Sequence, residues 1–315
     1  MTKIKVADKS GFCFGVKRAI GIAENAVNAD KKTYTLGPII HNPQEVDRLE
    51  KEGIKTLKDA KKVKNATIIL RTHGIPLFLH KELLGKKDVE IIDATCPFVK
   101  RAQNIVTELA SKGETIIIAG EKKHPEVVAL VSYGGDKCFV IENFFEAEKF
   151  NGQSSYINIV SQTTQTPKNF SDIVKSLKKR YKVKVYNTIC KATFDRQNAA
   201  QKLAAKVDLM IVIGGKNSGN TTRLAQICAQ KTKTRHIETV SEIKPEWFKE
   251  TLSQGSLPQK KIGLTAGAST PGWIIKQVKE EIKRQLTASA GLRRASKTGN
   301  KSAAAGIRTN KNKVQ

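Results

Sequence analysis

The chain has 315 residues, enough for two or three compact units that each bury a core. Its formal net charge is +27, which favours acidic substrates or polyanionic partners, although a generally basic proteome explains it equally well. Every apolar run is far shorter than the ~20 residues of a membrane span, and the first residues form no apolar signal core. We therefore expect a cytoplasmic protein without a membrane contact.

Five cysteines are spread along the chain, and no two of them form a Cys-x-x-Cys pair. An odd number without close pairs argues against a disulfide framework, a zinc ribbon or a redox dithiol. Three of the cysteines, Cys13, Cys96 and Cys190, each open a helix-like stretch with an arginine in its first turns. They are the starting points of an internal repeat.

The repeat is visible in two spacings counted from these cysteines. A glycine follows each cysteine after 24 residues, directly behind a short β-like run, and a polar residue follows after 28 residues, at the start of another helix pattern. The glycines are Gly37, Gly120 and Gly214, and the polar residues are His41, His124 and Ser218. Because both spacings recur in all three places, the sequence predicts three related units.

A third landmark in each unit follows another short apolar run: Arg71–Gly74, Ser161–Thr164 and Thr265–Ser269. Apolar runs that alternate with helical patterns predict α/β units with small, mostly parallel sheets, which bind ligands beyond the carboxyl ends of their strands. We expect the three units to surround one central site. The expected ranges are 14–95, 96–189 and 190–286, with residues 1–13 packed on the third unit and a tail from 287 to 315.

The repeated cysteines suit an iron–sulfur site. A thiolate at a helix N-terminus is stabilised by the helix dipole and the free N–H groups. Three thiolates near a threefold axis can hold a four-iron cluster and leave one iron open to a substrate as a Lewis acid. A single cysteine of this kind is more often a core residue. Cys138 and Cys228 match no repeated position, so we assign them to packing.

The repeated helix starts predict an anion site, because helix N-termini bind anions. His41-Asn-Pro43 and His124-Pro-Glu126 both look like capped helix starts, as does the stretch from Gly214 to Thr221. If these starts converge, they can hold a diphosphate. The side chains that would bind it are those of His41, His73, His124, Ser218, Asn220 and Ser269.

One carboxyl group lies within this predicted site. Glu126 follows His124 in the first turn of a helix, and a buried carboxyl near a cluster would have a raised pKa and could act as a general acid. A glutamate that only complements the helix dipole explains the sequence equally well. His80 and His236 occupy no landmark, and we interpret them as structural.

Nine stretches, in order over roughly residues 1–285, resemble the IspH/LytB family. No single stretch is specific, but the ordered set is. The stretches are Gly11-Phe-Cys-Phe-Gly-Val-Lys-Arg-Ala-Ile20, Gly37-Pro-Ile-Ile-His-Asn42, Arg71-Thr-His-Gly74, Asp93-Ala-Thr-Cys-Pro97, His124-Pro-Glu-Val127, Ser161-Gln-Thr-Thr164, Ile189-Cys-Lys-Ala-Thr-Phe-Asp-Arg-Gln197, Gly215-Lys-Asn-Ser-Gly-Asn220 and Thr265-Ala-Gly-Ala-Ser269.

This resemblance implies a trefoil of three α/β domains and the reductive removal of the hydroxyl from (E)-4-hydroxy-3-methylbut-2-enyl diphosphate. The implied products are isopentenyl and dimethylallyl diphosphate, in the last step of the methylerythritol phosphate pathway. It also implies one [4Fe-4S] cluster per chain, whose apical iron binds the substrate hydroxyl, and a ferredoxin or flavodoxin as electron donor.

The same resemblance implies roles for individual residues. Cys13, Cys96 and Cys190 would hold the cluster, and Glu126 with Thr163 would relay protons. The implied substrate-binding residues are His41, His73, His124, Thr163, Thr164, Ser218, Gly219, Asn220 and Ser269.

The chain departs from the family pattern in two places. Gly219 stands where the family often has serine, so a hydroxyl is lost there, although the backbone N–H can still bind phosphate. The segment from Thr287 onwards lies outside the family core and has seven lysines and arginines and no acidic residue. Its composition predicts a disordered tail that could contact a polyanion.

Three other functions explain less of the sequence. A nucleic-acid-binding protein would use the +27 charge, but it should show interleaved aromatic residues or a binding motif, and neither is present. A hydro-lyase or synthase with a three-cysteine cluster is disfavoured by the ordered motifs. An electron-transfer protein without a substrate would leave the landmark histidines without a role.

Overall fold

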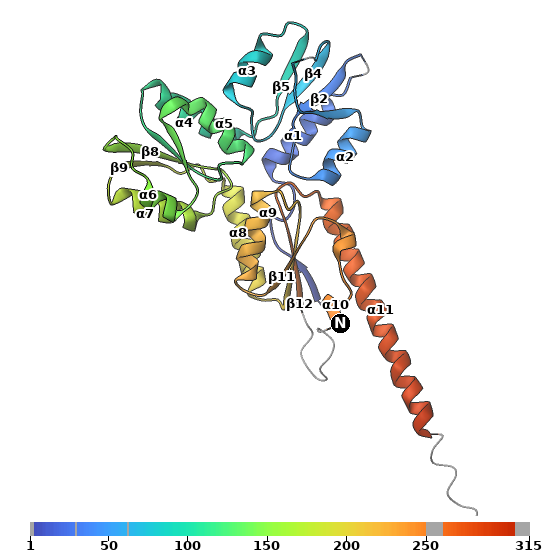
Figure 1. The fold of residues 1–315 in the computed structure, drawn as a ribbon. Coiled ribbons are helices and arrows are strands. Elements are labelled where there is room, and N and C mark those ends of the chain that lie inside the picture. Colours follow the sequence, from blue (N-terminus) through green and yellow to red (C-terminus); the bar gives the residue numbers. More distant parts are fainter. Residues whose placement is uncertain (1–2, 29, 62, 250–260, 306–315) are drawn as a thin grey trace, which may run out of the picture.

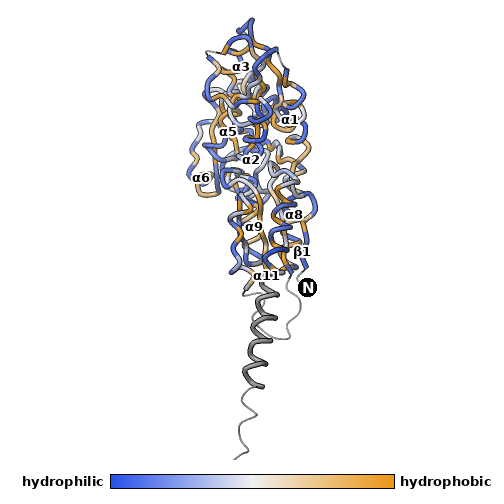
Figure 2. The backbone as a smooth tube through the Cα atoms, turned by 90° about the vertical axis from the view of Figure 1, so that its right-hand side faces the viewer, coloured by the Kyte–Doolittle hydropathy of each residue, from blue (hydrophilic) through white to orange (hydrophobic). Residues whose placement is uncertain are grey.

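The computed structural model describes residues 3–28, 30–61, 63–249 and 261–305. Three α/β units, each with one parallel sheet of four strands, are arranged around a common centre (Figure 1). Turned by 90°, the body is narrower than in the first view, so the three units form a flattened assembly (Figure 2). The predicted trefoil of three α/β units is confirmed.

The first two sheets share one strand order. The first has the order β3-β2-β4-β5, and the second has the order β7-β6-β8-β9. In both, the chain runs from the first strand to one side and then returns to the other side, so its direction of growth reverses between two central strands. The strands are β2 (Lys32–Leu36), β3 (Ile54–Leu57), β4 (Ala66–Leu70), β5 (Val89–Asp93), β6 (Ile116–Ala119), β7 (Cys138–Ile141), β8 (Tyr156–Ser161) and β9 (Lys182–Tyr186).

The third sheet repeats this order with a strand from the other end of the chain. Its order is β11-β10-β12-β1, where β1 (Lys3–Val6) occupies the place of β5 and β9. β1 runs parallel to β12, and Lys3 pairs with Lys261. Each repeated cysteine therefore follows the outer strand of one unit and precedes the first helix of the next. The remaining strands are β10 (Leu209–Ile213), β11 (Lys233–Ile237) and β12 (Lys261–Ala266).

Helices cover both faces of each sheet. On one face lie a helix that begins after a repeated cysteine and a second one that begins after the 28-residue landmark: α1 (Phe14–Asn25) with α2 (Pro43–Lys51), α4 (Pro97–Ser111) with α5 (Pro125–Gly134), and α8 (Lys191–Ala204) with α9 (Gly219–Ala229). The other faces carry α3 (Leu77–Leu84), α6 (Phe144–Lys149) with α7 (Pro167–Lys178), and α10 (Glu246–Lys249) with α11 (Gly272–Ala305). Two short 3₁₀ turns are η1 (Gly135–Lys137) and η2 (Val240–Glu242).

The central strands β4 and β10 are buried along their whole length because helices cover both faces of their sheets. All five residues of β10 are buried, as are all five of β4. Parallel sheets with helices on both faces have such continuous apolar strands. Burying each large side chain contributes about 1.5–3 kcal/mol, so these strands hold the units together.

The loops after the central strands hold the predicted landmarks. In sheets of this kind, ligands bind where the direction of strand order reverses, beyond the carboxyl ends of the strands. Gly37 and Gly214 have φ values of +72° and +139°, which favour glycine. A Cβ on Gly120 would lie 2.7 Å from Val127 Cγ2. The three repeated glycines thus let the chain turn closely at the end of each first strand.

One sequence prediction is wrong for part of its range. The composition predicts disorder from Thr287, whereas α11 is unbroken from Gly272 to Ala305 and extends away from the three units (Figure 1). Alanine, leucine, arginine and lysine are good helix formers, and extending an existing helix requires no new nucleus. Residues 306–315 lie outside the described residues. No described helix combines the length and apolar character that a bilayer crossing requires.

Candidate active site

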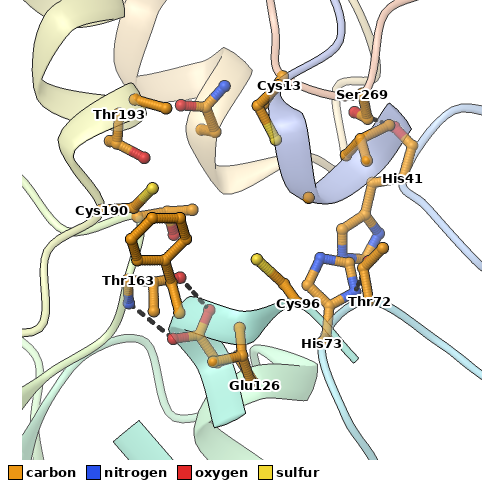
Figure 3. A pocket seen from close by; sticks show the side chains of 18 of the residues that line it. Cys13, His41, Thr72, His73, Cys96, Glu126, Thr163, Cys190, Thr193 and Ser269 are labelled. Carbon is orange, nitrogen blue, oxygen red and sulfur yellow. Dashed lines mark hydrogen bonds between the residues drawn. The ribbon is translucent and has the colours of Figure 1, made fainter. Parts of the chain in front are cut away.

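One pocket is lined by residues from all three units (Figure 3). Its walls are the loops after the central strands and the first turns of α1, α4, α5, α8 and α9. Every residue that the sequence proposes for the site lines this pocket: Cys13, His41, His73, Cys96, His124, Glu126, Thr163, Thr164, Cys190, Ser218, Gly219, Asn220 and Ser269. Residues far apart in the sequence are therefore gathered at one place.

The three repeated cysteines are the N-cap residues of α1, α4 and α8, and their side chains make no capping hydrogen bond. Burial raises the thiol pKa of Cys96 and of Cys190, and backbone N–H groups of the following helix turn oppose this effect. A Cβ on Gly15 would lie 2.5 Å from Cys96 Sγ, so glycine leaves room for this sulfur. The sulfur atoms are thus free to bind a ligand in the pocket.

The other two cysteines lie in apolar cores, as predicted. Cys228 is fully buried between α8, α9 and β10, and burial raises its pKa to about 11. Cys138 packs against the cluster under α4 and α5, where burial raises its pKa to about 12. Neither lines the pocket.

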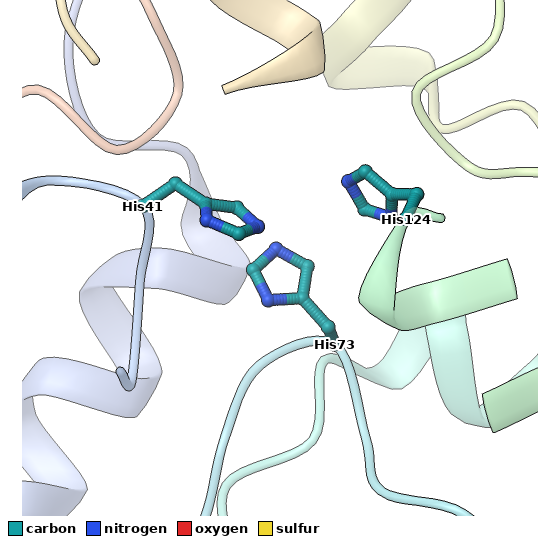
Figure 4. Close-up of side chains that lie close together, drawn as sticks. All are labelled: His41, His73 and His124. Atoms are coloured by element: carbon teal, nitrogen blue, oxygen red, sulfur yellow. The ribbon is translucent and has the colours of Figure 1, made fainter. Parts of the chain in front are cut away.

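Three histidines form a tight cluster in the pocket (Figure 4). His41 comes from the loop after β2, His73 from the loop after β4, and His124 is the N-cap of α5. The ring centroids of His41 and His73 are 4.4 Å apart, and those of His73 and His124 are 5.4 Å apart. Two units therefore contribute rings to one surface.

The histidines are held in a neutral form. Burial is the largest cause that lowers the pKa of each ring, and it lowers that of His124 to about 3. The positive charge of Arg71 lowers all three further. The Glu126 N–H donates to His124 Nδ1 over 3.2 Å, which places the proton of a neutral ring on Nε2. His41 Nε2 is buried without a hydrogen-bond partner among the described residues.

This cluster suits an anion better than a metal ion. Imidazole nitrogens of the three rings lie within 4.8 Å of one another, a spacing from which a metal site can form. However, the charges of Arg71 and Arg223 act on His124, and a cation placed here would meet the same repulsion. Polar N–H groups in a positive field are the environment that phosphate prefers.

The third unit contributes polar groups at the start of α9. Ser218 is the N-cap, and its hydroxyl accepts from the Thr221 N–H. Both amide atoms of Asn220 are buried without a hydrogen-bond partner among the described residues. A Cβ on Gly219 would lie 3.2 Å from Glu121 Oε2. The Glu121 carboxylate therefore occupies the space that a larger side chain at position 219 would need. Ser269 donates to the His41 carbonyl over 3.0 Å and links the third unit to the first.

Glu126 and Thr163 form a buried pair (Figure 3). The Thr163 N–H donates to Glu126 Oε1 over 2.6 Å, and the Thr163 hydroxyl donates to Oε2 over 2.7 Å. Glu126 is only 1% exposed, and burial raises its pKa to about 7 in spite of both hydrogen bonds. A carboxyl group with this pKa can both give and take a proton near neutral pH.

A family model described as LytB protein matches residues 4–283. The chain belongs to the LytB protein family. This match spans all three sheets and every residue that lines the pocket.

Two relatives of the chain have the same activity in their names. The chain is 47% identical over 282 residues to the 4-hydroxy-3-methylbut-2-enyl diphosphate reductase of Pelobacter propionicus, a match covering 89% of this chain and 97% of the relative. It is 45% identical over 284 residues to the reductase of that name from Geotalea uraniireducens, covering 90% of this chain and 97% of the relative.

Solved structures of such reductases have the same fold. One is described as (E)-4-hydroxy-3-methyl-but-2-enyl diphosphate reductase, the terminal enzyme of the non-mevalonate pathway. It is 44% identical, with a TM-score of 0.64 over 90% of this chain and 100% of that one. The structure of the E-1-hydroxy-2-methyl-but-2-enyl-4-diphosphate reductase from Plasmodium falciparum is 29% identical, with a TM-score of 0.80 over 89% of this chain and 87% of that one.

No role was assigned from the sequence to some residues of the site. Thr72 lies inside the first unit's third landmark, and Arg196 lies in the first turns of α8, so both were visible but unassigned. Arg223 does not line the pocket, but its charge acts on His124, and no sequence pattern pointed to it. From α9 it donates to the Thr164 carbonyl over 2.7 Å and pairs with Glu121 over 2.6 Å, which ties the third unit to the second.

The two remaining histidines lie outside the pocket, as expected. His80 is part of α3, and His236 is part of β11. His236 Nε2 lies 2.9 Å from the Gly214 carbonyl oxygen and supports the turn after β10.

Proposed function

We propose that this chain is a 4-hydroxy-3-methylbut-2-enyl diphosphate reductase. It removes the hydroxyl of (E)-4-hydroxy-3-methylbut-2-enyl diphosphate with two electrons and two protons, breaks the C–O bond, and releases water with isopentenyl or dimethylallyl diphosphate. The observation that carries this proposal is the pocket itself, which combines three thiols, three neutral histidines and a buried acid. The identity of 47% to a reductase of this name supports it.

The donor set of the pocket fits one [4Fe-4S] cluster per chain, held by Cys13, Cys96 and Cys190. Each unit begins with one of these N-cap thiols, and no other cysteine of the described residues lines the pocket. Thiolate sulfur is the ligand that such clusters require. When bound, the cluster would supply electrons and an iron with an open position as a Lewis acid.

The polar rim would bind the diphosphate. His124 presents its Nε2–H, the buried Nε2 of His41 lacks a partner, and Asn220 offers an unpartnered amide. A bound anion would stabilise the charged form of these rings and raise the pKa values that burial lowers. The residues proposed to bind substrate are His41, His73, His124, Thr163, Thr164, Ser218, Gly219, Asn220 and Ser269.

Glu126 and Thr163 would deliver protons. When the Glu126 carboxylate is ionised, it accepts a hydrogen bond of 2.7 Å from the Thr163 hydroxyl. When Glu126 is protonated, the same hydroxyl can accept from it and turn its own hydrogen into the pocket. This relay would protonate the leaving hydroxyl, so that it departs as water.

The remaining features of the proposal rest on the sequence and the family resemblance. A ferredoxin or flavodoxin would donate the electrons, and the chain would act in the cytoplasm. We place the units at residues 14–95, 96–189 and 190–286, with residues 1–13 on the third. The pairing of β1 with β12 supports this arrangement.

The proposal is tested with anaerobically purified protein. We expect about four irons per chain and release of both products from the diphosphate substrate when a low-potential reductant is added. Boiled protein and protein stripped of iron serve as controls. Folded protein that binds iron but leaves this substrate unchanged would refute the reductase assignment.

A further inference from the structure

Arg196 is a pocket residue that the mechanism above does not use. It lies on α8, in the helix that Cys190 begins, and it is only 2% exposed. One of its terminal nitrogens, Nη1, donates to the Lys9 carbonyl and also to the Ala266 carbonyl, the latter over 3.2 Å. Its Nε is buried and has no hydrogen-bond partner among the described residues.

This arginine also lacks an acidic partner. The ion pairs of the described residues include none with Arg196. A guanidinium remains charged in proteins, and burying it without a counter-charge is costly. The groups whose negative charge raises the pKa of Arg196 are Cys13 and Cys190, which, when ionised, stabilise its charged form against the larger effect of burial.

We propose that Arg196 is a positioning residue that acts as the fixed counter-cation of the cysteine centre and raises the reduction potential of the cluster held there. This inference rests on the proposed function, because it needs the cluster. Four observations support the inference: Arg196 is buried, it lines the pocket, its Nε has no hydrogen-bond partner among the described residues, and no carboxylate pairs with it there.

The direction of the effect follows from charge. Reduction adds negative charge to a cluster, and a nearby positive charge stabilises the reduced form. Net charge and hydrogen bonds to the sulfur atoms are among the factors that set cluster potentials. Arg196 can supply both, because its charge is permanent and its Nε–H has no other acceptor.

A structural role makes a different prediction. Arg196 joins the loop before Cys13 to the end of β12, and Lys9 in that loop has a φ of +61°. If these hydrogen bonds were its whole purpose, a neutral side chain that keeps a donor would preserve the potential. The experiment therefore has to separate charge from hydrogen bonding.

The test compares Arg196→Gln, which keeps donors without charge, with Arg196→Lys, which keeps the charge. Arg235→Gln is the matched control, because Arg235 lies in β11 of the same unit but does not line the pocket. Its guanidinium carbon lies 5.4 Å from the centroid of the Trp247 ring. Iron content and the cluster midpoint potential are measured anaerobically. At a fixed potential we expect the reduced-to-oxidised ratio to fall at least ~10-fold in Arg196→Gln, a shift of 59 mV for one electron.

In Arg196→Lys and Arg235→Gln, the ratio of reduced to oxidised cluster should stay within about threefold of that in the unsubstituted protein. If Arg196→Gln loses its iron while Arg196→Lys keeps both the iron and the midpoint potential, the result also supports a role for the positive charge. An unchanged potential in Arg196→Gln with full iron would overturn the inference. So would folded protein that loses iron in both variants, because the guanidinium shape would then be decisive. Unsubstituted protein without iron would overturn the proposed function itself.

Discussion

At the residue scale, burial decides the protonation of the pocket. His124 is the N-cap of α5 and Glu126 lies in its first turn, and their exposed fractions are 7% and 1%. Burial disfavours the charged form of both, so it raises the pKa of Glu126 to about 7 and lowers that of His124 to about 3. A pocket without substrate is therefore poised with mostly neutral groups. A diphosphate would bring the charge that the imidazoles need.

Glu126→Gln tests the proton-delivery role. The amide keeps the shape of the side chain but has no transferable proton, so we expect turnover to fall at least ~100-fold while the iron content and substrate affinity stay unchanged. Reductant-driven turnover and iron are measured on the same sample. Glu146→Gln is the control, because Glu146 lies in the first turn of α6, outside the pocket. Near-normal turnover of Glu126→Gln would leave Glu126 with only its helix-dipole role.

The histidine cluster should make stability fall in acid. Because the pKa of His124 is lowered from 6.5 to about 3, its stabilising contribution is complete above pH 6.5 and is lost progressively as the pH falls towards 3. At about pH 5.5 the loss is about 1.4 kcal/mol for this ring. The free energy of unfolding is compared at about pH 7.5 and about pH 5.5.

His124→Asn removes the titrating ring but keeps a side chain that can cap α5. This variant should lose about 1.4 kcal/mol less on acidification than the unsubstituted chain, and inorganic pyrophosphate should reduce the loss in the latter. His80→Asn, on α3, should behave like the unsubstituted chain. Equal acid losses in His124→Asn and the unsubstituted chain would contradict the burial argument.

At the element scale, the helix start is the unit that is repeated. α1, α4 and α8 begin after a cysteine, and α2, α5 and α9 begin after Asn42, His124 and Ser218, whose side chains accept from their own helix. The first group of caps leaves the sulfur atoms without capping bonds, whereas the second group uses its side chains for capping. The same local device thus leaves the cap side chain free in one case and stabilises the helix start in the other.

Cysteine substitutions separate these positions. Cys96→Ser should lower the iron content well below four per chain, because it removes a thiolate from the pocket. Cys138→Ser should keep the iron, because Cys138 is the first residue of β7 and packs against the apolar cluster under α4 and α5. Anaerobic iron assays on both variants decide the matter. Intact iron in Cys96→Ser together with loss in Cys138→Ser would show that the ligands are assigned wrongly.

At the scale of the whole molecule, the trefoil is closed by both ends of the chain. β1 completes the third sheet beside β12, and the same strand leads to Cys13. α11 packs on that sheet through Ile274, Val278 and Ile282. These contacts come from the first turns of α11, and the helix continues to Ala305.

Removing residues 287–315 should therefore leave function nearly intact. We expect turnover within about twofold of the full chain and a similar unfolding temperature, since the core residues Ile274, Val278 and Ile282 of α11 precede this segment. Ile282→Ala in the full chain is the comparison, and the cavity it creates should cost about 2–5 kcal/mol of unfolding free energy. A large loss of turnover in the truncated protein would show that the segment contributes to the site.

The sequence by itself determined the local parts of this protein. The spacings of Cys13, Gly37 and His41 and their counterparts are repeated along the chain, and caps, turns and apolar strands depend on neighbouring residues. The three units and the placement of the pocket residues could be predicted for that reason. The helix over residues 287–305 could not be predicted in this way, because the extension of a helix depends on the element that precedes it.

Only the tertiary structure decided the electrostatics and the contacts between units. The bridge from Arg223 to Glu121 and Thr164, and the unpaired burial of Arg196, join residues that no spacing relates. The pKa of Glu126 also depends on the tertiary structure, and it reaches about 7 because packing removes water from the carboxyl group. Burial and charge are sums over neighbours in space, whereas a sequence pattern reports neighbours along the chain.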